Sequence, residues 1–235
     1  MSELLRISGL WGGYKEGVDI LRGIDISIDE GEAVGIIGLN GSGKSTLGKA
    51  ILNMIPIRQG EIVFAGESIM GLRTYELVRK GISIMQQGGQ VFQNLSVWDN
   101  LEIAFNSGMD RSLERLREVI PILRLPRRQL KSIGADKLSG GQKHQLALSM
   151  ALATQPRLVI LDEPSAGLSP KSVEEMYEVL QKAREALAVT IVLIEQNVAR
   201  ADAFCDHCLL IKQGVIDRVF SANSLDDIET AMFSD

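Results

Sequence analysis

The pattern with the clearest chemical meaning is a glycine-rich octamer that ends in Lys-Ser. Residues 38–45 read Gly-Leu-Asn-Gly-Ser-Gly-Lys-Ser, which fits G-x-x-x-x-G-K-[ST]. Glycines let successive backbone N–H groups curve around an anion, and a following helix directs its positive end at the same place. The octamer predicts a triphosphate site, in which Lys44 reaches the β- and γ-phosphates, Ser45 binds Mg²⁺ and Thr46 hydrogen-bonds the α-phosphate. The predicted phosphate-binding residues are Gly38, Asn40, Gly41, Ser42, Gly43, Lys44, Ser45 and Thr46.

An apolar run that ends in two carboxylates is the second pattern. Residues 158–161 read Leu-Val-Ile-Leu and are followed by Asp162 and Glu163. Strand ends next to a phosphate loop are where a parallel sheet presents its ligands. We therefore expect Asp162 to hold Mg²⁺ opposite Ser45, and Glu163 to accept a proton from the attacking water. An ordinary strand capped by solvated acids is the alternative, which the presence of Lys44 disfavours.

A third pattern, Leu-Ser-Gly-Gly-Gln at residues 138–142, precedes a helical run over residues 143–153. Ser139 is a natural N-cap, and the two glycines after it expose backbone N–H groups at the positive end of the helix. A plain capped helix has no use for Gly140 and Gly141, because glycine there costs conformational entropy. The string therefore predicts a second anion site.

The elements that position these patterns follow from hydrophobic periodicity and turn residues. Strands are predicted at residues 4–8, 23–28, 33–37, 62–64, 82–85, 158–161, 190–194, 208–211 and 215–219. Helices are predicted at residues 45–55, ending near Pro56, at 170–186, and across 97–153 with interruptions at Pro121 and Pro126. Strands that alternate with helices predict an α/β fold with a mostly parallel, doubly wound sheet and an inserted helical subdomain.

The composition of the chain limits the kinds of partner that it can bind. The chain has 235 residues, with 25 Lys plus Arg against 30 Asp plus Glu and a net charge of −5, which argues against nucleic acid as the main partner. No secretory signal is expected, and the apolar runs are far shorter than the roughly 20 residues of a membrane helix. We therefore expect a cytoplasmic protein that reaches a membrane only through a partner. Cys205 and Cys208 are expected to be reduced thiols flanking a strand rather than half of a zinc site.

The octamer, the Leu-Ser-Gly-Gly-Gln string and the acidic strand, in this order, resemble the nucleotide-binding subunits of ABC transporters over nearly the whole chain. The resemblance implies a P-loop NTPase (RecA-like) core with an N-terminal antiparallel β subdomain and an inserted α-helical subdomain. It implies a single domain over residues 1–235, with the core at 1–87 and 155–235 and the helical subdomain at about 88–154. It also implies head-to-tail pairing of two ATPase subunits, in which the partner's ATP is contacted by Ser139, Gly140, Gly141 and Gln142.

Three further residues take roles from the same resemblance. Tyr14 sits where the family places an aromatic ring that stacks on adenine, and Trp11 is a weaker candidate. Gln87 falls where the family has a glutamine that meets Mg²⁺ and the attacking water, although the neighbouring Gln86 leaves the register open. Gln196 occupies a position at which most members have a histidine that contacts the γ-phosphate.

Residues 85–92 and 194–197 look like the smaller ATPase of branched-chain amino acid importers, with urea and short-chain amide importers as the alternative. The resemblance then implies two transmembrane permease subunits, a substrate-binding protein, and a place on the inner face of the cell membrane. An acidic residue usual at the position of Ser169 is missing, and Gln196 cannot carry an imidazolium charge. A heterodimer with a second ATPase is therefore expected, with a homodimer as the alternative. Phe92 is expected either to contact the permease or to anchor the helical subdomain.

Three other classes of protein carry some of these patterns. A non-transport ABC ATPase would have long coiled-coil arms between residues 45 and 138, where this chain shows no sustained heptads. A nucleotide-binding regulatory module that does not hydrolyse ATP is disfavoured by Glu163. A small-molecule P-loop kinase would lack the Leu-Ser-Gly-Gly-Gln string. An ATPase that uses ATP and Mg²⁺ to drive transport is the favoured interpretation.

Overall fold

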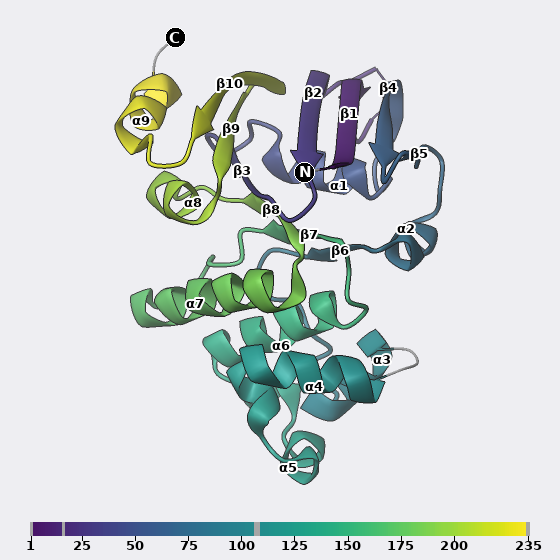
Figure 1. Cartoon of the computed structure of the whole chain (residues 1–235), viewed down its shortest axis with the longest axis vertical. Helices are drawn as coiled ribbons and strands as arrows, with labels where there is room; N and C mark the ends of the chain where they lie inside the picture. Colours follow the sequence, from purple (N-terminus) through teal and green to yellow (C-terminus); the bar gives the residue numbers. More distant parts are fainter. Residues whose placement is uncertain (1, 16, 106–108, 234–235) are drawn as a thin grey trace. The chain divides into compact units, whose positions relative to one another are not determined.

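The computed structural model describes residues 2–15, 17–105 and 109–233. The chain forms two compact units, one made of Met1–Ile82 with Thr190–Asp235 and the other of Ser83–Val189. We describe each unit by itself, using the element labels of Figure 1. In the described part of the chain, no helix has both the length and the apolar character needed to cross a membrane.

The first unit contains an antiparallel sheet with the strand order β2-β1-β4-β5. Its strands are β1 (Glu3–Gly12), β2 (Leu21–Asp29), β4 (Ile57–Phe64) and β5 (Glu67–Ser68). Side chains alternate along β1, so that Leu5 and Ile7 are buried while Arg6 and Ser8 are exposed. Leu5 pairs with Ile28 of β2, and this register keeps apolar residues on one face. The expected N-terminal antiparallel β subdomain is confirmed.

Four more strands of the first unit follow the order β10-β9-β3-β8. They are β3 (Ala33–Ile37), β8 (Thr190–Ile194), β9 (His207–Lys212) and β10 (Val215–Ser221). Strand β3 runs parallel to both β8 and β9, and β10 is antiparallel to β9. Every residue of β3 and β8 is buried, as expected for strands covered on both faces. Because the three strands are parallel, the segments that follow Ile37, Ile194 and Lys212 share one edge of the sheet.

The helices of the first unit are short. They are α1 (Lys44–Ile51), α2 (Thr74–Lys80), α8 (Val198–Phe204) and α9 (Leu225–Phe233). Helix α1 ends four residues earlier than its predicted end at residue 55, which corrects that prediction. The reason is Asn53, which has a left-handed φ of 51° and donates its side-chain amide to the carbonyls of Ile69 and Leu72. These contacts are remote in sequence, so the periodicity of α1 did not reveal them.

The second unit is mostly helical. Its elements are β6 (Ile82–Met85, beginning at the unit boundary), α3 (Val97–Phe105), α4 (Met109–Val119), η1 (Pro121–Arg124), α5 (Arg127–Ser132), η2 (Ala135–Lys137), α6 (Gly140–Leu152), β7 (Leu158–Asp162) and α7 (Pro170–Leu187). Strands β6 and β7 are neighbours, and α6 packs against α3 and α7. The helical run breaks at Pro121 and Pro126, as the sequence predicts.

Contact density places residues 155–189 in the same unit as the helical stretch, whereas the sequence assigns them to the core. The boundaries of the helical subdomain at about 88–154 stay a prediction. The short elements β5, α2, α8 and α9 have no counterpart among the predicted elements. Cys205 and Cys208 are both buried and are not joined in a disulfide, and they lie on either side of the start of β9.

Candidate functional site

The octamer connects the end of β3 to the start of α1, as its pattern requires. Gly38 has a φ of 149°, and a Cβ atom there would lie 2.3 Å from the carbonyl oxygen of Ile211 in β9. Gly43 is the N-cap of α1 with a φ of 114°. Only glycine fits these two backbone conformations without strain, so the close approach of the loop to β9 depends on them. The loop presents its N–H groups at the positive end of α1.

Lys44 lies inside the curve of this loop. Its side chain is only 5% exposed, and its Nζ donates to the carbonyl oxygens of Gly38 at 2.9 Å and Leu39 at 3.1 Å. Ser45 is half-buried and Thr46 is buried in the first turn of α1. A buried ammonium beside a cluster of N–H groups makes the loop suited to a polyanion.

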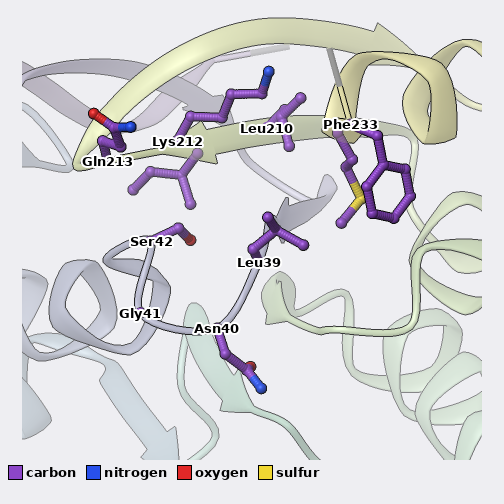
Figure 2. Close-up of a pocket in the computed structure, with 10 residues that line it drawn as sticks. Leu39, Asn40, Gly41, Ser42, Leu210, Lys212, Gln213 and Phe233 are labelled. Carbon is purple, nitrogen blue, oxygen red and sulfur yellow. The ribbon is translucent and has the colours of Figure 1, made fainter. Parts of the chain in front are cut away.

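One face of the loop borders a cavity of about 470 Å³, drawn in Figure 2. The walls are Leu39–Ser42 from the loop, 210–213 from β9 and its following turn, and Met232 and Phe233 from α9. The side chains of Leu39 and Phe233 point toward this space, whereas the Asn40 side chain points away from it (Figure 2). Ser42 lines the cavity, and its buried hydroxyl has no hydrogen-bond partner among the described residues.

The contribution of α9 to this wall is absent from the predicted site. The signal available was Ser224 followed by Asp227, a capping-box spacing ahead of apolar residues at helical intervals. The contribution of β9 had no local signal, because it depends on the pairing of β9 with β3.

Tyr14 is 50% exposed, and the Lys49 ammonium lies 5.4 Å from the centre of its ring. A cation at this distance is attracted to the ring by about 0.5–1 kcal/mol at an exposed site. Trp11 is half-buried, with the Arg58 guanidinium 5.3 Å from its ring centre. Of the two aromatic candidates, Tyr14 has the more accessible ring.

Gln196 follows β8 and is exposed. Its backbone N–H and that of Asn197 are directed at the buried Glu195 carboxylate, at 3.1 and 3.4 Å. The Asn197 side chain caps α8 by accepting from the N–H of Arg200. The backbone of Gln196 is therefore fixed on both sides, at the sheet edge that also carries the octamer.

The acidic pair lies in the second unit, at the end of β7. Asp162 is the last residue of this strand and is buried. Glu163 follows with a left-handed φ of 48°, which costs a non-glycine residue about 1–3 kcal/mol. The Gln87 amide donates a hydrogen bond to the Glu163 carboxylate. The residue that donates this hydrogen bond is Gln87 rather than its neighbour Gln86.

Ser139 caps α6, which confirms the predicted N-cap. The Ser139 hydroxyl accepts from the N–H of Gln142 at 3.3 Å, and the Gln142 side chain accepts from the N–H of Ser139 at 3.0 Å. A Cβ on Gly141 would lie 3.2 Å from the Ser172 hydroxyl of α7, whereas Gly140 has more room. Ser139 and Gly140 are exposed, so this helix end is accessible to an anion.

The chain matches the ABC transporter family model over residues 21–166. It is 35% identical, over 94% of both chains, to the probable branched-chain amino acid transport ATP-binding protein LivF of Archaeoglobus fulgidus. It is 32% identical to the high-affinity branched-chain amino acid transport ATP-binding protein BraG of Pseudomonas aeruginosa, over 86% of this chain and 87% of BraG. It is also 30% identical to the lipopolysaccharide export system ATP-binding protein LptB of Acidithiobacillus ferridurans, over 97% of this chain and 93% of LptB.

Among solved structures, the chain resembles the ATP-binding cassette MJ0796 in a dimeric post-hydrolysis state bound to ADP and Pi. The TM-score is 0.79 and the identity is 26%, over 94% of this chain and all of that one. Relatives of this kind bind ATP and hydrolyse it.

Proposed function

Because the chain belongs to the ABC transporter family and is an ATPase subunit coupled to transport, we propose that it powers uptake of branched-chain or other hydrophobic amino acids. The cargo would pass through a separate permease of two transmembrane subunits, fed by a substrate-binding protein. The observation that carries the proposal is the likeness to LivF and BraG over most of the chain. In this assembly the subunit lies on the inner face of the membrane.

Two other cargoes belong to the same proposal as alternatives. The likeness to LptB raises lipopolysaccharide export. Urea and short-chain amide import stays the alternative that the resemblance of residues 85–92 and 194–197 implies. The three are distinguished by co-purifying the permease and binding protein and identifying the small molecule that the binding protein retains. Leucine, isoleucine or valine supports the proposal, and urea, an amide or a lipopolysaccharide partner refutes it.

The first half of the proposed chemistry is nucleotide binding. The N–H groups of residues 38–45 hold the phosphates, and Lys44 exchanges the carbonyls of Gly38 and Leu39 for the β- and γ-phosphates. Asn40, Gly41, Ser42, Gly43 and Thr46 complete this cradle. Tyr14 stacks on adenine through its accessible face. Gln196 donates a hydrogen bond to the γ-phosphate.

The second half is hydrolysis. Glu163 accepts a proton from the attacking water, and Gln87, hydrogen-bonded to that carboxylate, orients the same water. Ser45, Gln87 and Asp162 offer hydroxyl, amide and carboxylate oxygens, the hard ligands that suit Mg²⁺. When bound, Mg²⁺ neutralises charge on the β- and γ-phosphates. Positioning and charge neutralisation then suffice without a covalent intermediate.

We propose that the active form is a dimer of ATPase chains, with a second ABC ATPase as the preferred partner and a second copy as the alternative. Because the Ser139 hydroxyl accepts from Gln142, its own hydrogen remains able to donate to a phosphate of the partner's ATP. Gly140 and Gly141 add backbone N–H groups, and Gln142 supports them through the capping box. Mass measurement of the purified complex distinguishes one kind of ATPase chain from two.

Phe92 is proposed as a contact to the permease. Its ring is 52% exposed, so the core-anchor alternative is disfavoured. Its backbone is held by the fully buried Asn100, whose side chain accepts from the Phe92 N–H at 2.8 Å and donates to the Phe92 carbonyl at 3.0 Å. A rigid backbone that presents an exposed aromatic ring suits an interface.

A further inference from the structure

His144 lies on α6, one turn after the two glycines of the Leu-Ser-Gly-Gly-Gln string, and is only 5% exposed. Its Nδ1 lies 3.0 Å from the carbonyl oxygen of Gly140. A carbonyl can only accept, so Nδ1 carries a proton here and Nε2 is the second polar atom of the ring. Nε2 is buried and has no hydrogen-bond partner in the described residues. A buried nitrogen without a hydrogen-bond partner lowers stability, and an apolar side chain would fill the same space without that penalty.

The ring of His144 packs against the loop that contains Gln87. A Cβ atom on Gly89 would lie 3.0 Å from both Cγ and Nδ1 of the His144 ring, and 3.2 Å from the His144 Cα. The neighbouring Gly88 has open space around the same position. Both glycines have positive φ, 81° for Gly88 and 58° for Gly89. The loop therefore meets α6 at Gly89, with no room for a side chain between them.

These contacts form a continuous series within the second unit. The Gly140 carbonyl meets His144, the His144 ring meets Gly89, and Gln87, two residues before Gly89, donates to the Glu163 carboxylate. At one end are backbone groups proposed to contact the partner's ATP. At the other end is the proposed catalytic base.

We propose that His144 is a positioning residue, which holds the Gln87 loop against the start of α6 and so links occupancy of the Ser139–Gly141 site to the placement of Gln87 and Glu163. The proposal rests on the proposed function, because it assigns His144 a part in that hydrolysis. His144 touches no nucleotide in this scheme. It acts through Gly89 and Gln87, so its loss lowers kcat and leaves the affinity of the octamer for ATP unchanged.

The two adjacent glycines supply a matched pair of variants. Gly88→Ala and Gly89→Ala impose the same kind of positive-φ strain, but only Gly89→Ala places a methyl group against His144. In the assembled transporter we expect Gly88→Ala to keep at least about a third of the wild-type kcat, and Gly89→Ala to lose about tenfold or more with an unchanged KM for ATP. Adding His144→Ala to Gly89→Ala removes the ring atoms that the methyl group meets, so the double variant should lose no more kcat than Gly89→Ala alone, whereas independent effects would multiply to about fiftyfold.

His144→Ala alone separates positioning from packing. Both roles lower the thermal midpoint, because a buried ring is lost. Only positioning also lowers kcat, by about fivefold or more at unchanged KM, with partial rescue in His144→Gln. A kcat for His144→Ala equal to that of wild type, equal kcat values for Gly88→Ala and Gly89→Ala, or a loss in the double variant equal to the product of the two single losses would each overturn the proposal.

A spectroscopic readout covers the case in which Gly89→Ala fails to assemble. The chain has two histidines, so histidine-selective ¹³C labelling gives two sets of ring signals, and His207→Gln identifies the set that belongs to His144. Gln87→Ala should shift the His144 signals and Gln86→Ala should leave them in place. Unshifted His144 signals in Gln87→Ala would contradict the link. If wild-type complex hydrolyses no ATP, the proposed function fails, whereas normal wild-type turnover with insensitive variants removes only the role of His144.

Discussion

Replacing Asn100 with alanine should destabilise the second unit and release the loop that presents Phe92. Asn100 is fully buried in α3, and its side chain makes hydrogen bonds to the Phe92 N–H, the Phe92 carbonyl and the Ser96 carbonyl, at 2.8, 3.0 and 2.9 Å. At about 1 kcal/mol net for each bond, the expected loss is about 3 kcal/mol. For a chain of this length that corresponds to a fall of about 6–12 °C in the thermal midpoint.

Phe92→Ala is the matched control. It removes the half-exposed ring but keeps the clamp of Asn100, so the loss of stability should be about 1 kcal/mol or less. Thermal unfolding followed by circular dichroism measures both effects on the purified subunit. Transport per ATP hydrolysed, measured in proteoliposomes, should fall for both variants, because each disturbs the proposed permease contact.

Two results would contradict these expectations. If Asn100→Ala shifts the thermal midpoint by less than about 2 °C, the three hydrogen bonds do not contribute as the distances indicate. If Phe92→Ala transports with the wild-type yield per ATP, the exposed ring is not part of the permease interface.

Four further changes test the nucleotide site in the assembled complex. Glu163→Gln should bind ATP but lose nearly all turnover, and accumulate as an ATP-bound dimer on size-exclusion chromatography; wild-type turnover would remove Glu163 from the base role. Lys44→Ala should weaken ATP binding measured by calorimetry, because a buried charge facing the phosphates is lost; unchanged affinity would refute the site. Tyr14→Ala should weaken ATP by about 1–3 kcal/mol with kcat retained, and an equal effect on a ribose-triphosphate probe without a base would argue against stacking. Gln196→Ala should slow hydrolysis in its own site by at most about 1.5–3 kcal/mol while Gln196→His stays active, which site-resolved turnover measures with the partner ATPase silenced.

Several features of this protein follow from short stretches of sequence. The octamer turns between β3 and α1 because only glycine fits the backbone at Gly38 and Gly43. The glycine pattern that meets this requirement can be read directly from one sequence. The cap of α6 follows from Ser139 and Gln142, because a capping box joins residues three apart. Strands β3 and β8 begin and end at their predicted residues, since buried parallel strands read as nearly unbroken apolar runs. Strand β6 also keeps its predicted bounds, Ile82–Met85.

Other features depend on contacts between residues that are distant in sequence, and the tertiary structure decided them. The hydrogen bond of Gln87, rather than Gln86, to the Glu163 carboxylate joins residues that are 76 positions apart. The end of α1 depends on hydrogen bonds from Asn53 to carbonyls that are 16 and 19 residues away. The exposure of Phe92 depends on a buried amide in α3, and the wall of the cavity beside the octamer depends on the pairing of β9 with β3. Sequence patterns report local backbone requirements and burial, whereas the direction of a side chain in a loop is set by whatever packs against it.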